Sequence, residues 1–301
     1  MLKQRLTDWA SWLRVYKSHE ALAPVIERIC ERERLPGVEF AAVSASTNAV
    51  FASDKYVLKI YAPDECGMAV GTDADIEMFG LRRADRLGIP VPQLLAAGEV
   101  EDEYVFRYII MERIHGVPLN KAAHGLSSAQ KEGLGSRIRD IADRLNTPCA
   151  DFGATDVMAH ALSHTGWADY LVSFQRERLE WLQFHVTYED EWVYCHGDLN
   201  PDNVLIGANL SVSIIDFADG VRAPRLYEHA VIASELFRFE KPFMRGFFGN
   251  YKPEEMLELC AAGLLLHDIG NEILPGHIGP AAEITSLAVM RERLNSLIIG
   301  G

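Results

Sequence analysis

The side chains best suited to chemistry gather between residues 192 and 217. Asp198 and Asn203 lie in a run of glycine, proline, aspartate and asparagine flanked by apolar residues, and Asp216 ends the next apolar stretch. Phosphoryl transfer needs a carboxylate that orients an acceptor hydroxyl, and Mg²⁺, which prefers carboxylate and amide oxygens. An aspartate-rich turn is also a common loop. The ordered set of three, with the spacing of a kinase catalytic loop, nevertheless indicates phosphoryl transfer.

The hydrophobic pattern predicts the elements that must position these residues. Before residue 118 it predicts strands at 38–43, 49–53, 56–61, 93–97 and 104–111. It also predicts two helices there, at 7–34 and 72–87. Beyond residue 118 helical spacing dominates, over 127–146, 167–185, 226–239 and the C-terminal part, with short strands at 192–194, 204–206 and 212–215. This order predicts an α+β chain in two lobes. We expect a small antiparallel-sheet lobe over 1–111, a hinge over 112–118, and a larger, mostly helical lobe over 119–301.

Two motifs carry a resemblance to a known family. The sequence HGDLNPDN at 196–203, followed by IDF at 215–217, resembles the aminoglycoside phosphotransferase and choline kinase-like family. The resemblance extends from about Val38 to at least His229 and implies a protein-kinase-like fold. It further implies that Asp198 is the catalytic base and that Asn203 and Asp216 bind Mg²⁺. His196 is then expected to support the loop without transferring a proton.

A cation on the nucleotide phosphates, and an anion that holds it, are also needed. Lys59 lies in an apolar strand, and the helix that follows offers Glu77 as a partner, with Asp73 and Asp75 as alternatives. The resemblance implies a Lys59–Glu77 pair in which Lys59 reaches the α- and β-phosphates of ATP. Use of GTP in place of ATP stays open.

The chain has no Gly-x-Gly-x-x-Gly loop, and a run of small polar residues at 44–48 stands between two predicted strands instead. Small residues let a backbone approach phosphates closely, although such a run is also typical of an ordinary turn. The resemblance favours a phosphate-binding loop that uses Ser44, Ser46 and Asn48.

The predicted strand at 104–111 continues into Glu112 and Ile114, and this segment resembles the family's approach to the hinge. By that resemblance the Glu112 carbonyl and the Ile114 amide contact the adenine edge, with Met111 behind the ring. An ordinary buried strand is the alternative, and both interpretations can hold together.

The composition narrows the partners. The 301 residues carry a formal net charge of −14, which disfavours nucleic acid and anionic membranes and favours small cations. The five cysteines are scattered without a Cys-x-x-Cys pair, as is typical of a reducing compartment. The sequence shows no signal peptide and no apolar stretch long enough to cross a bilayer. We therefore expect a cytoplasmic protein without an obligate protein partner.

The acceptor is expected to be a small molecule, because little chain separates Asp216 from the helical pattern near Leu226 and no Ala-Pro-Glu element follows. Candidate residues for its site are acidic or aromatic: Asp219, Glu228, Glu235, Trp167, Tyr170, Asp268 and Glu272. The leading hypothesis is an antibiotic kinase that phosphorylates a hydroxyl of an aminoglycoside-like compound. A metabolic kinase of choline, an amino alcohol or a sugar is the alternative, and a nucleotide-binding protein without catalysis is the third. Residues 223–229 depart from the family's usual Asp-Pro-x-Tyr-Asp-Leu pattern, which leaves the acceptor open.

Overall fold

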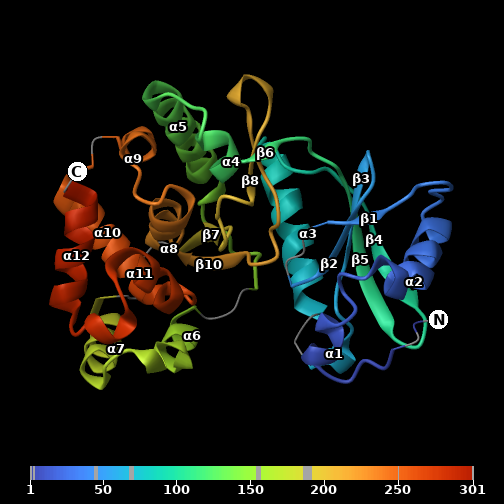
Figure 1. The fold of residues 1–301 in the computed structure, drawn as a ribbon, viewed down its shortest axis with the longest axis horizontal. Coiled ribbons are helices and arrows are strands. Elements are labelled where there is room, and N and C mark those ends of the chain that lie inside the picture. Colours follow the sequence, from blue (N-terminus) through green and yellow to red (C-terminus); the bar gives the residue numbers. More distant parts are fainter. Residues whose placement is uncertain are drawn as a thin grey trace. The chain divides into compact units, whose positions relative to one another are not determined.

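The computed structural model describes residues 2, 4–43, 47–67, 71–153, 157–185, 192–249 and 251–299, with only the backbone of Gly71 and Thr72 (Figure 1). Within these residues the chain forms two compact units. The first unit contains Met1–His115 together with Asp216–Asp219, and the second contains Gly116–Ile215 and Gly220–Gly301. The division after His115 falls inside the segment 112–118.

The first unit is built on an antiparallel five-stranded sheet with the order β1-β2-β3-β5-β4. Its strands are β1 (Ala41–Ala42), β2 (Ala49–Ala52), β3 (Tyr56–Ile60), β4 (Leu94–Glu101) and β5 (Val105–Glu112). β1 is shorter than the strand predicted over 38–43. Both of its alanines are exposed, so burial adds little to extend the pairing of this edge strand.

Helices cover both faces of this sheet. They are α1 (Trp9–Leu13), α2 (His19–Arg32) and α3 (Gly71–Arg86), with a 3-10 turn at Asp64–Cys66. Arg107 of β5 contacts Asp75 of α3, whereas the hydroxyl of the next residue, Tyr108, donates to Glu33 at the end of α2. Because neighbouring residues on a strand point to opposite faces, α3 and α2 lie on opposite faces of the sheet, as Figure 1 shows.

The helix predicted over 7–34 is two helices. A new helix begins after Ser18, whose side chain accepts a hydrogen bond from the Ala21 amide and caps α2. The chain between α1 and α2 changes direction, which allows Trp12 of α1 to reach the sheet and contact Phe106. The hydrophobic spacing did not reveal this break, because both helices bury apolar residues.

The second unit is mostly helical. Its helices are α4 (Leu119–Ala123), α5 (Ser128–Leu145), α6 (Val157–Ser163), α7 (Val172–His185), α8 (Arg225–Val231), α9 (Lys241–Phe248), α10 (Pro253–Leu266), α11 (Gly270–Ile278) and α12 (Leu287–Ile299). Short 3-10 turns lie at Thr165–Asp169, Ala208–Leu210 and Ala281–Glu283, and a π turn lies at Ile232–Leu236. The predicted helix over 226–239 thus changes its hydrogen-bond pattern after Val231. Within the part of the chain that the structure describes, no helix is both long and apolar enough to cross a membrane.

Two small sheets in the second unit hold the loop at 196–203. β7 (Trp192–Cys195) pairs with β10 (Val221–Pro224), and β8 (Val204–Ile206) pairs with β6 (Val117–Pro118) and with β9 (Val212–Ile214). β7 enters the loop and β8 leaves it, so each end of the loop belongs to a different sheet. Neither β6 nor β10 shows a clear alternating pattern, so both were absent from the predicted strands.

Glycines allow α5 and α9 to pack closely. A Cβ atom on Gly135 of α5 would lie 2.4 Å from the Phe243 carbonyl oxygen, and one on Gly246 of α9 would lie 2.0 Å from the Glu132 oxygen. Both contacts are with backbone atoms, which cannot move aside without shifting a helix. By contrast, a Cβ atom on Gly133, also in α5, would meet no atom within 4 Å.

These contacts predict opposite effects for one substitution at two positions of the same helix. Gly135→Ala should lower the free energy of unfolding by about 1–3 kcal/mol, because α5 and α9 must separate. Gly133→Ala should raise it by about 0.5–1 kcal/mol through the helix propensity of alanine. Urea unfolding of both variants measures these free energies. Equal changes in the two variants would show that the close packing of α5 on α9 does not determine the effect of an added methyl group.

Candidate active site

Asp198 is held in one orientation by two asparagine side chains. The Asn200 Nδ2 group donates to both Asp198 carboxylate oxygens, at 3.0 and 2.9 Å, and Asn203 Nδ2 donates to Asp198 Oδ2 at 2.9 Å. Asn200 Oδ1 in turn accepts the backbone amides of Asp202 and Asn203. Asp198 stays half-buried, so its carboxylate is fixed without being enclosed. Asn200 was not among the predicted site residues, although turns often use asparagine to bond the backbone two residues on.

The orientation of the Asn203 amide follows from its partners. Its Nδ2 group donates to the Asp198 carbonyl oxygen as well as to the Asp198 carboxylate, both at 2.9 Å. Because both partners only accept, the nitrogen must face them, and Oδ1 points away from Asp198. The Asn203 carbonyl accepts the Ile215 amide at 3.0 Å, which ties the end of the loop to the residue before Asp216. Asn203 therefore presents an amide oxygen from a fixed backbone.

His196 connects the start of the loop to the same neighbour. Its ring is buried; Nδ1 accepts the Asp198 amide at 3.3 Å, and Nε2 lies 3.0 Å from the Ile215 carbonyl oxygen. An amide only donates and a carbonyl only accepts, so the ring is neutral in this arrangement, with its proton on Nε2. His196 thus orients the backbone around Asp198 and is fully used in doing so.

The peptide groups of Gly197 are bound on both sides. The Gly197 amide donates to Glu228 Oε2 of α8 at 3.1 Å, and its carbonyl oxygen accepts from His267 Nε2 at 3.2 Å. The other ring nitrogen of His267 lies 2.9 Å from Asp268 Oδ1, and the Tyr227 ring stacks on the imidazole with centroids 4.0 Å apart. Gly197 has a φ of +87°, a conformation that favours glycine. His267 was not among the predicted site residues, because its contact with Gly197 spans seventy residues of chain.

The two anchors of Gly197 depend on close packing between α8 and α10. A Cβ atom on Gly263 of α10 would lie 2.3 Å from the Leu226 carbonyl oxygen and 2.3 Å from the Ala230 Cβ atom of α8. Glu228 lies on α8, and His267 follows the last turn of α10. The glycine at 263 therefore lets both anchoring side chains reach the same peptide.

Glu228 lies in the interior, with only 1% of its surface exposed. Glu228 was predicted to line the acceptor site; the structure places it under the loop, where it accepts a hydrogen bond from the Gly197 amide. Burial raises the pKa of Glu228 to about 8, the nearby Asp198 charge adds to the shift, and hydrogen bonds from the His196 and Gly197 backbone oppose it. The carboxyl group is therefore mostly protonated at neutral pH.

The raised pKa of Glu228 predicts a pH-dependent contribution to stability. The unfolded chain ionises Glu228 near the ordinary pKa of 4.5, whereas the folded chain does so near 8. Between these pH values the folded state binds the extra proton, so stability falls as pH rises. Glu228→Gln keeps an oxygen acceptor for Gly197 without a titrating group. Its melting temperature should fall less than that of the parent between pH 5 and pH 8.

The control for this experiment is Glu272→Gln, which removes an exposed carboxylate of the same unit. This variant should keep the pH dependence of the parent. Parallel curves for Glu228→Gln and the parent would show that Glu228 does not titrate in this range.

Lys59 forms the centre of a buried ion cluster in the first unit. Its Nζ atom lies 2.7 Å from Glu77 Oε2 and 2.6 Å from Asp216 Oδ1, and the Tyr61 hydroxyl donates to Glu77 Oε2 at 2.5 Å. Burial by itself would lower the pKa of Lys59, but the Glu77 and Asp216 carboxylates outweigh it and raise this pKa above its ordinary value. The ammonium group is thus charged. Of the three acidic candidates on α3, Glu77 is the one that pairs with Lys59, and Tyr61 is a further partner of Glu77 that was not predicted.

Asp216 adopts an unusual backbone conformation, with a φ of +64°. Few residues other than glycine occupy this region, and aspartate is among those enriched in it. Such strain persists where the surrounding structure holds it, often at functional sites. Here the carboxylate is held by Lys59.

The segment predicted as a phosphate-binding loop is described only in part, since Ser44 and Ser46 lie outside the described residues. Asn48 is buried at the start of β2. The adjacent Thr47 carbonyl oxygen accepts from the Trp12 indole nitrogen of α1 at 3.1 Å. Trp12 is fully buried, so α1 braces this segment from the interior.

The predicted hinge residues follow the end of β5. Met111 is buried, Glu112 is exposed and Ile114 is half-buried. The Glu112 amide donates to the Gln93 carbonyl oxygen at 2.9 Å, which fixes the backbone beside β4.

The two aromatic candidates for the acceptor site lie in the interior. Trp167 and Tyr170 are each 3% exposed, and their rings lie 5.0 Å apart. The Arg178 guanidinium carbon lies 4.3 Å from the Trp167 ring centroid, and its nitrogens donate to the Leu265 and Ala161 carbonyl oxygens. Both oxygens lie near helix C-termini, where a cation is favourable. This packing accounts for both aromatic residues as parts of the core.

The remaining acidic candidates differ in their surroundings. Glu235 lies 3.1 Å from His277 Nε2, whereas Asp219 and Glu272 are exposed. Asp268 accepts the Tyr227 hydroxyl at 3.1 Å. Burial alone would raise the pKa of Asp268, but hydrogen bonds from His267 and Tyr227 hold it at about 2. Asp268 is therefore ionised.

Comparison with solved structures identifies the fold. The streptomycin–ATP–APH(2")-IIa ternary complex has a TM-score of 0.61 at 14% sequence identity. The alignment covers 89% of this chain and 98% of the chain in that complex. The GDP complex of wild-type aminoglycoside 2'-phosphotransferase-IIIa has a TM-score of 0.59 at 15% identity over 92% and 94%. Aminoglycoside phosphotransferase APH(4)-Ia has a TM-score of 0.57 at 16% identity over 93% and 99%. These similarities confirm the predicted kinase-like α+β fold.

Comparison by sequence identifies the family. No protein with a curated description matches the sequence. The family model described as "Phosphotransferase enzyme family" matches residues 37–259, which include Lys59, the loop at 196–203 and Asp216. This range covers well over half of the chain and confirms the resemblance inferred from the motifs. The chain therefore belongs to the phosphotransferase enzyme family.

Proposed function

We propose that this protein transfers the γ-phosphate of ATP to a hydroxyl of a small cationic acceptor of the aminoglycoside type. Asp198 is the base, and Asn203 and Asp216 are the Mg²⁺ ligands. The observation that carries the proposal is the Asp198 carboxylate, which two amide side chains orient while it stays half-buried. Family membership supports the reaction class.

The geometry around Asp198 suits a general base. Asn200 and Asn203 fix the carboxylate through its oxygens. Oδ2 accepts from both asparagines, whereas Oδ1 accepts from Asn200 and keeps a further lone pair for a hydroxyl proton. A base held in place needs no reorganisation when the acceptor binds, which lowers the barrier to proton transfer. The neutral His196 and the anchored Gly197 keep the backbone of Asp198 in position.

The donor set fits Mg²⁺. Asn203 offers an amide oxygen turned away from Asp198, and Asp216 offers a carboxylate, both of which are hard ligands. Among the described residues, no three His, Cys, Asp or Glu side chains form a group that could hold a metal by themselves. Water and the nucleotide phosphates would supply the remaining oxygens, as is common for Mg²⁺ in kinases. When bound, Mg²⁺ would neutralise charge on the phosphates.

Lys59 is suited to binding the phosphates of the nucleotide. Glu77 and Tyr61 fix its position, and its charge is secured by two carboxylates. We propose that Ser44, Ser46 and Asn48 contribute to the phosphate site, and that Met111, Glu112 and Ile114 contact the base. Structures with the same fold contain ATP or GDP, and turnover measured with ATP and with GTP distinguishes the two nucleotides.

A cationic acceptor fits the charge of the protein. The formal net charge is −14, and the acidic residues of the second unit include Glu235, Asp268 and the exposed Glu272. Structures with the same fold contain streptomycin, kanamycin or gentamicin. Carboxylates pair with the ammonium groups of such compounds, and each pair gains strength when partly shielded from water.

The first prediction of the proposal concerns Asp198. Purified protein should release ADP from Mg²⁺–ATP only with an acceptor from a panel of aminoglycosides, choline, amino alcohols and sugars. Asp198→Asn should lower kcat by about 10²–10⁴-fold, because the amide cannot take the hydroxyl proton. Asp202→Asn is the matched control in the same loop, since Asp202 is exposed, and it should keep most of the activity.

The panel separates the acceptor classes. Turnover with choline or a sugar alone would keep the kinase mechanism but replace the aminoglycoside acceptor. Equal loss in Asp198→Asn and Asp202→Asn would contradict the role of Asp198 as base. If the protein binds nucleotide but phosphorylates no acceptor of the panel, the proposed reaction is wrong.

A second prediction concerns the brace on the predicted phosphate-binding loop. Trp12→Phe removes the donor to the Thr47 carbonyl oxygen and keeps an aromatic ring. KM for ATP should rise about two- to tenfold, the range expected for one hydrogen bond, while KM for the acceptor stays unchanged. Trp9→Phe in the same helix is the control and should leave both constants unchanged. An equal rise in both KM values would indicate general destabilisation and not positioning of the loop.

A further inference from the structure

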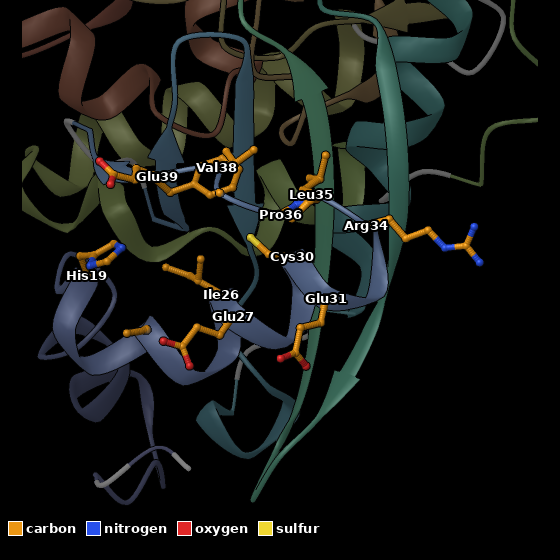
Figure 2. A pocket seen from close by; sticks show the side chains of 13 residues that line it. His19, Ile26, Glu27, Cys30, Glu31, Arg34, Leu35, Pro36, Val38 and Glu39 are labelled. Atoms are coloured by element: carbon orange, nitrogen blue, oxygen red, sulfur yellow. The ribbon is translucent and has the colours of Figure 1, made fainter.

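A groove of about 720 Å³ lies in the first unit, between α2 and the segment 34–40 that follows it (Figure 2). Figure 2 shows Ile26 and Cys30 pointing from α2 toward this segment, with Val38 on the other side of the gap. Its volume is in the range of small-molecule sites, about 300–1,000 Å³. The groove is therefore large enough to enclose the apolar part of a small ligand.

The interior of the groove is apolar. Ile26 and Phe40 are buried side chains that line it, and Leu35 and Val38 are half-buried beside them. Burial of such surfaces against an apolar ligand contributes roughly 25 cal/mol per Å². This surface therefore favours a ligand with an apolar group over a sugar.

The edge of the groove is acidic. Glu27, Glu31 and Glu39 are exposed lining residues, and among the described residues none of the three forms an ion pair. Glu27 and Glu31 are four residues apart on α2, where like charges destabilise a helix. Without a cation, their repulsion remains.

The nearby arginines do not compensate these charges. Arg28 contacts Asp102, and Arg32 donates to the Glu99 carbonyl oxygen, so both are used on the sheet side of α2. Arg34 lines the groove, but Figure 2 shows its guanidinium pointing away from it. A positively charged ligand would therefore meet carboxylates that lack a partner.

We propose that this groove binds a small amphiphilic amine. The apolar part of the ligand lies on Leu35 and Val38 above Ile26, and its ammonium group lies at the acidic edge of the groove, which carries Glu27 and Glu39. The site is separate from the proposed nucleotide site. Lys59 pairs with Glu77 of α3, which covers the opposite face of the sheet from α2. Most of the groove also precedes residue 37, where the family match begins.

The binding test uses three compounds with one apolar body and different charge: 4-phenylbutylammonium, 4-phenylbutanol and 4-phenylbutyrate. Calorimetry on the whole protein, without nucleotide or acceptor, should show affinity in the order cation, alcohol, anion. Because ATP and acceptor are absent, the result is independent of the proposed kinase activity.

Cys30 locates the ligand. It is half-buried in the groove, whereas the other four cysteines are buried, so alkylation with a maleimide should modify Cys30 first. Burial and the Glu27 charge raise the pKa of the Cys30 thiol, so the reaction is followed at mildly alkaline pH. Saturating 4-phenylbutylammonium should slow it severalfold.

Matched variants test the charges. The double variant Glu27→Gln with Glu39→Gln should weaken the cation about fivefold and leave the neutral alcohol unchanged. Glu20→Gln, on α2 but outside the groove, is the control and should bind the cation as the parent does.

Three outcomes would overturn the proposal. No protection of Cys30 by the cation would show that it binds elsewhere or not at all. Equal affinity for cation and anion would remove the role of the carboxylates. Protection of Cys30 that grows with protein concentration in the absence of amine, with dimers in sedimentation, would assign the groove to a second copy of the chain.

Discussion

The arrangement around Asp198 depends on one peptide segment that is bound on both sides. Gly197 donates its amide to a buried carboxyl group, Glu228, and accepts from a buried imidazole, His267. A buried backbone group without a partner would cost about as much as a lost hydrogen bond. Satisfying both groups therefore fixes the loop more firmly than its short flanking strands could.

Anchoring Gly197 in this way requires a buried carboxyl group and close packing of two helices. A carboxyl group in the interior must stay mostly protonated near neutral pH, and α8 and α10 must approach each other closely enough for both side chains to reach Gly197. Gly263 permits the approach, because any side chain there would meet the backbone of α8. The orientation of the proposed base, Asp198, therefore depends on a glycine in α10, Gly263, through the two side chains that anchor Gly197.

Much of the site could be predicted from local sequence, because the chemistry needs particular residue types at short spacing. The loop at 196–203, the strand carrying Lys59 and the kinase-like fold class were all accessible in this way. His267 and Tyr61 were not, because their contacts arise only when distant segments pack. The same limit applies to Trp167, since composition cannot distinguish a ring that faces a ligand from one that packs on a buried arginine.

The long spacing of the Gly197 anchors has a consequence for synthesis of the chain. Glu228 follows Gly197 by 31 residues and His267 follows it by 70. A nascent chain therefore displays its complete motif before either anchor has left the ribosome. Its loop can take the final conformation only after α10 has emerged and docked on α8. Shortened chains that end before His267 would carry every signature residue and still lack a preformed site.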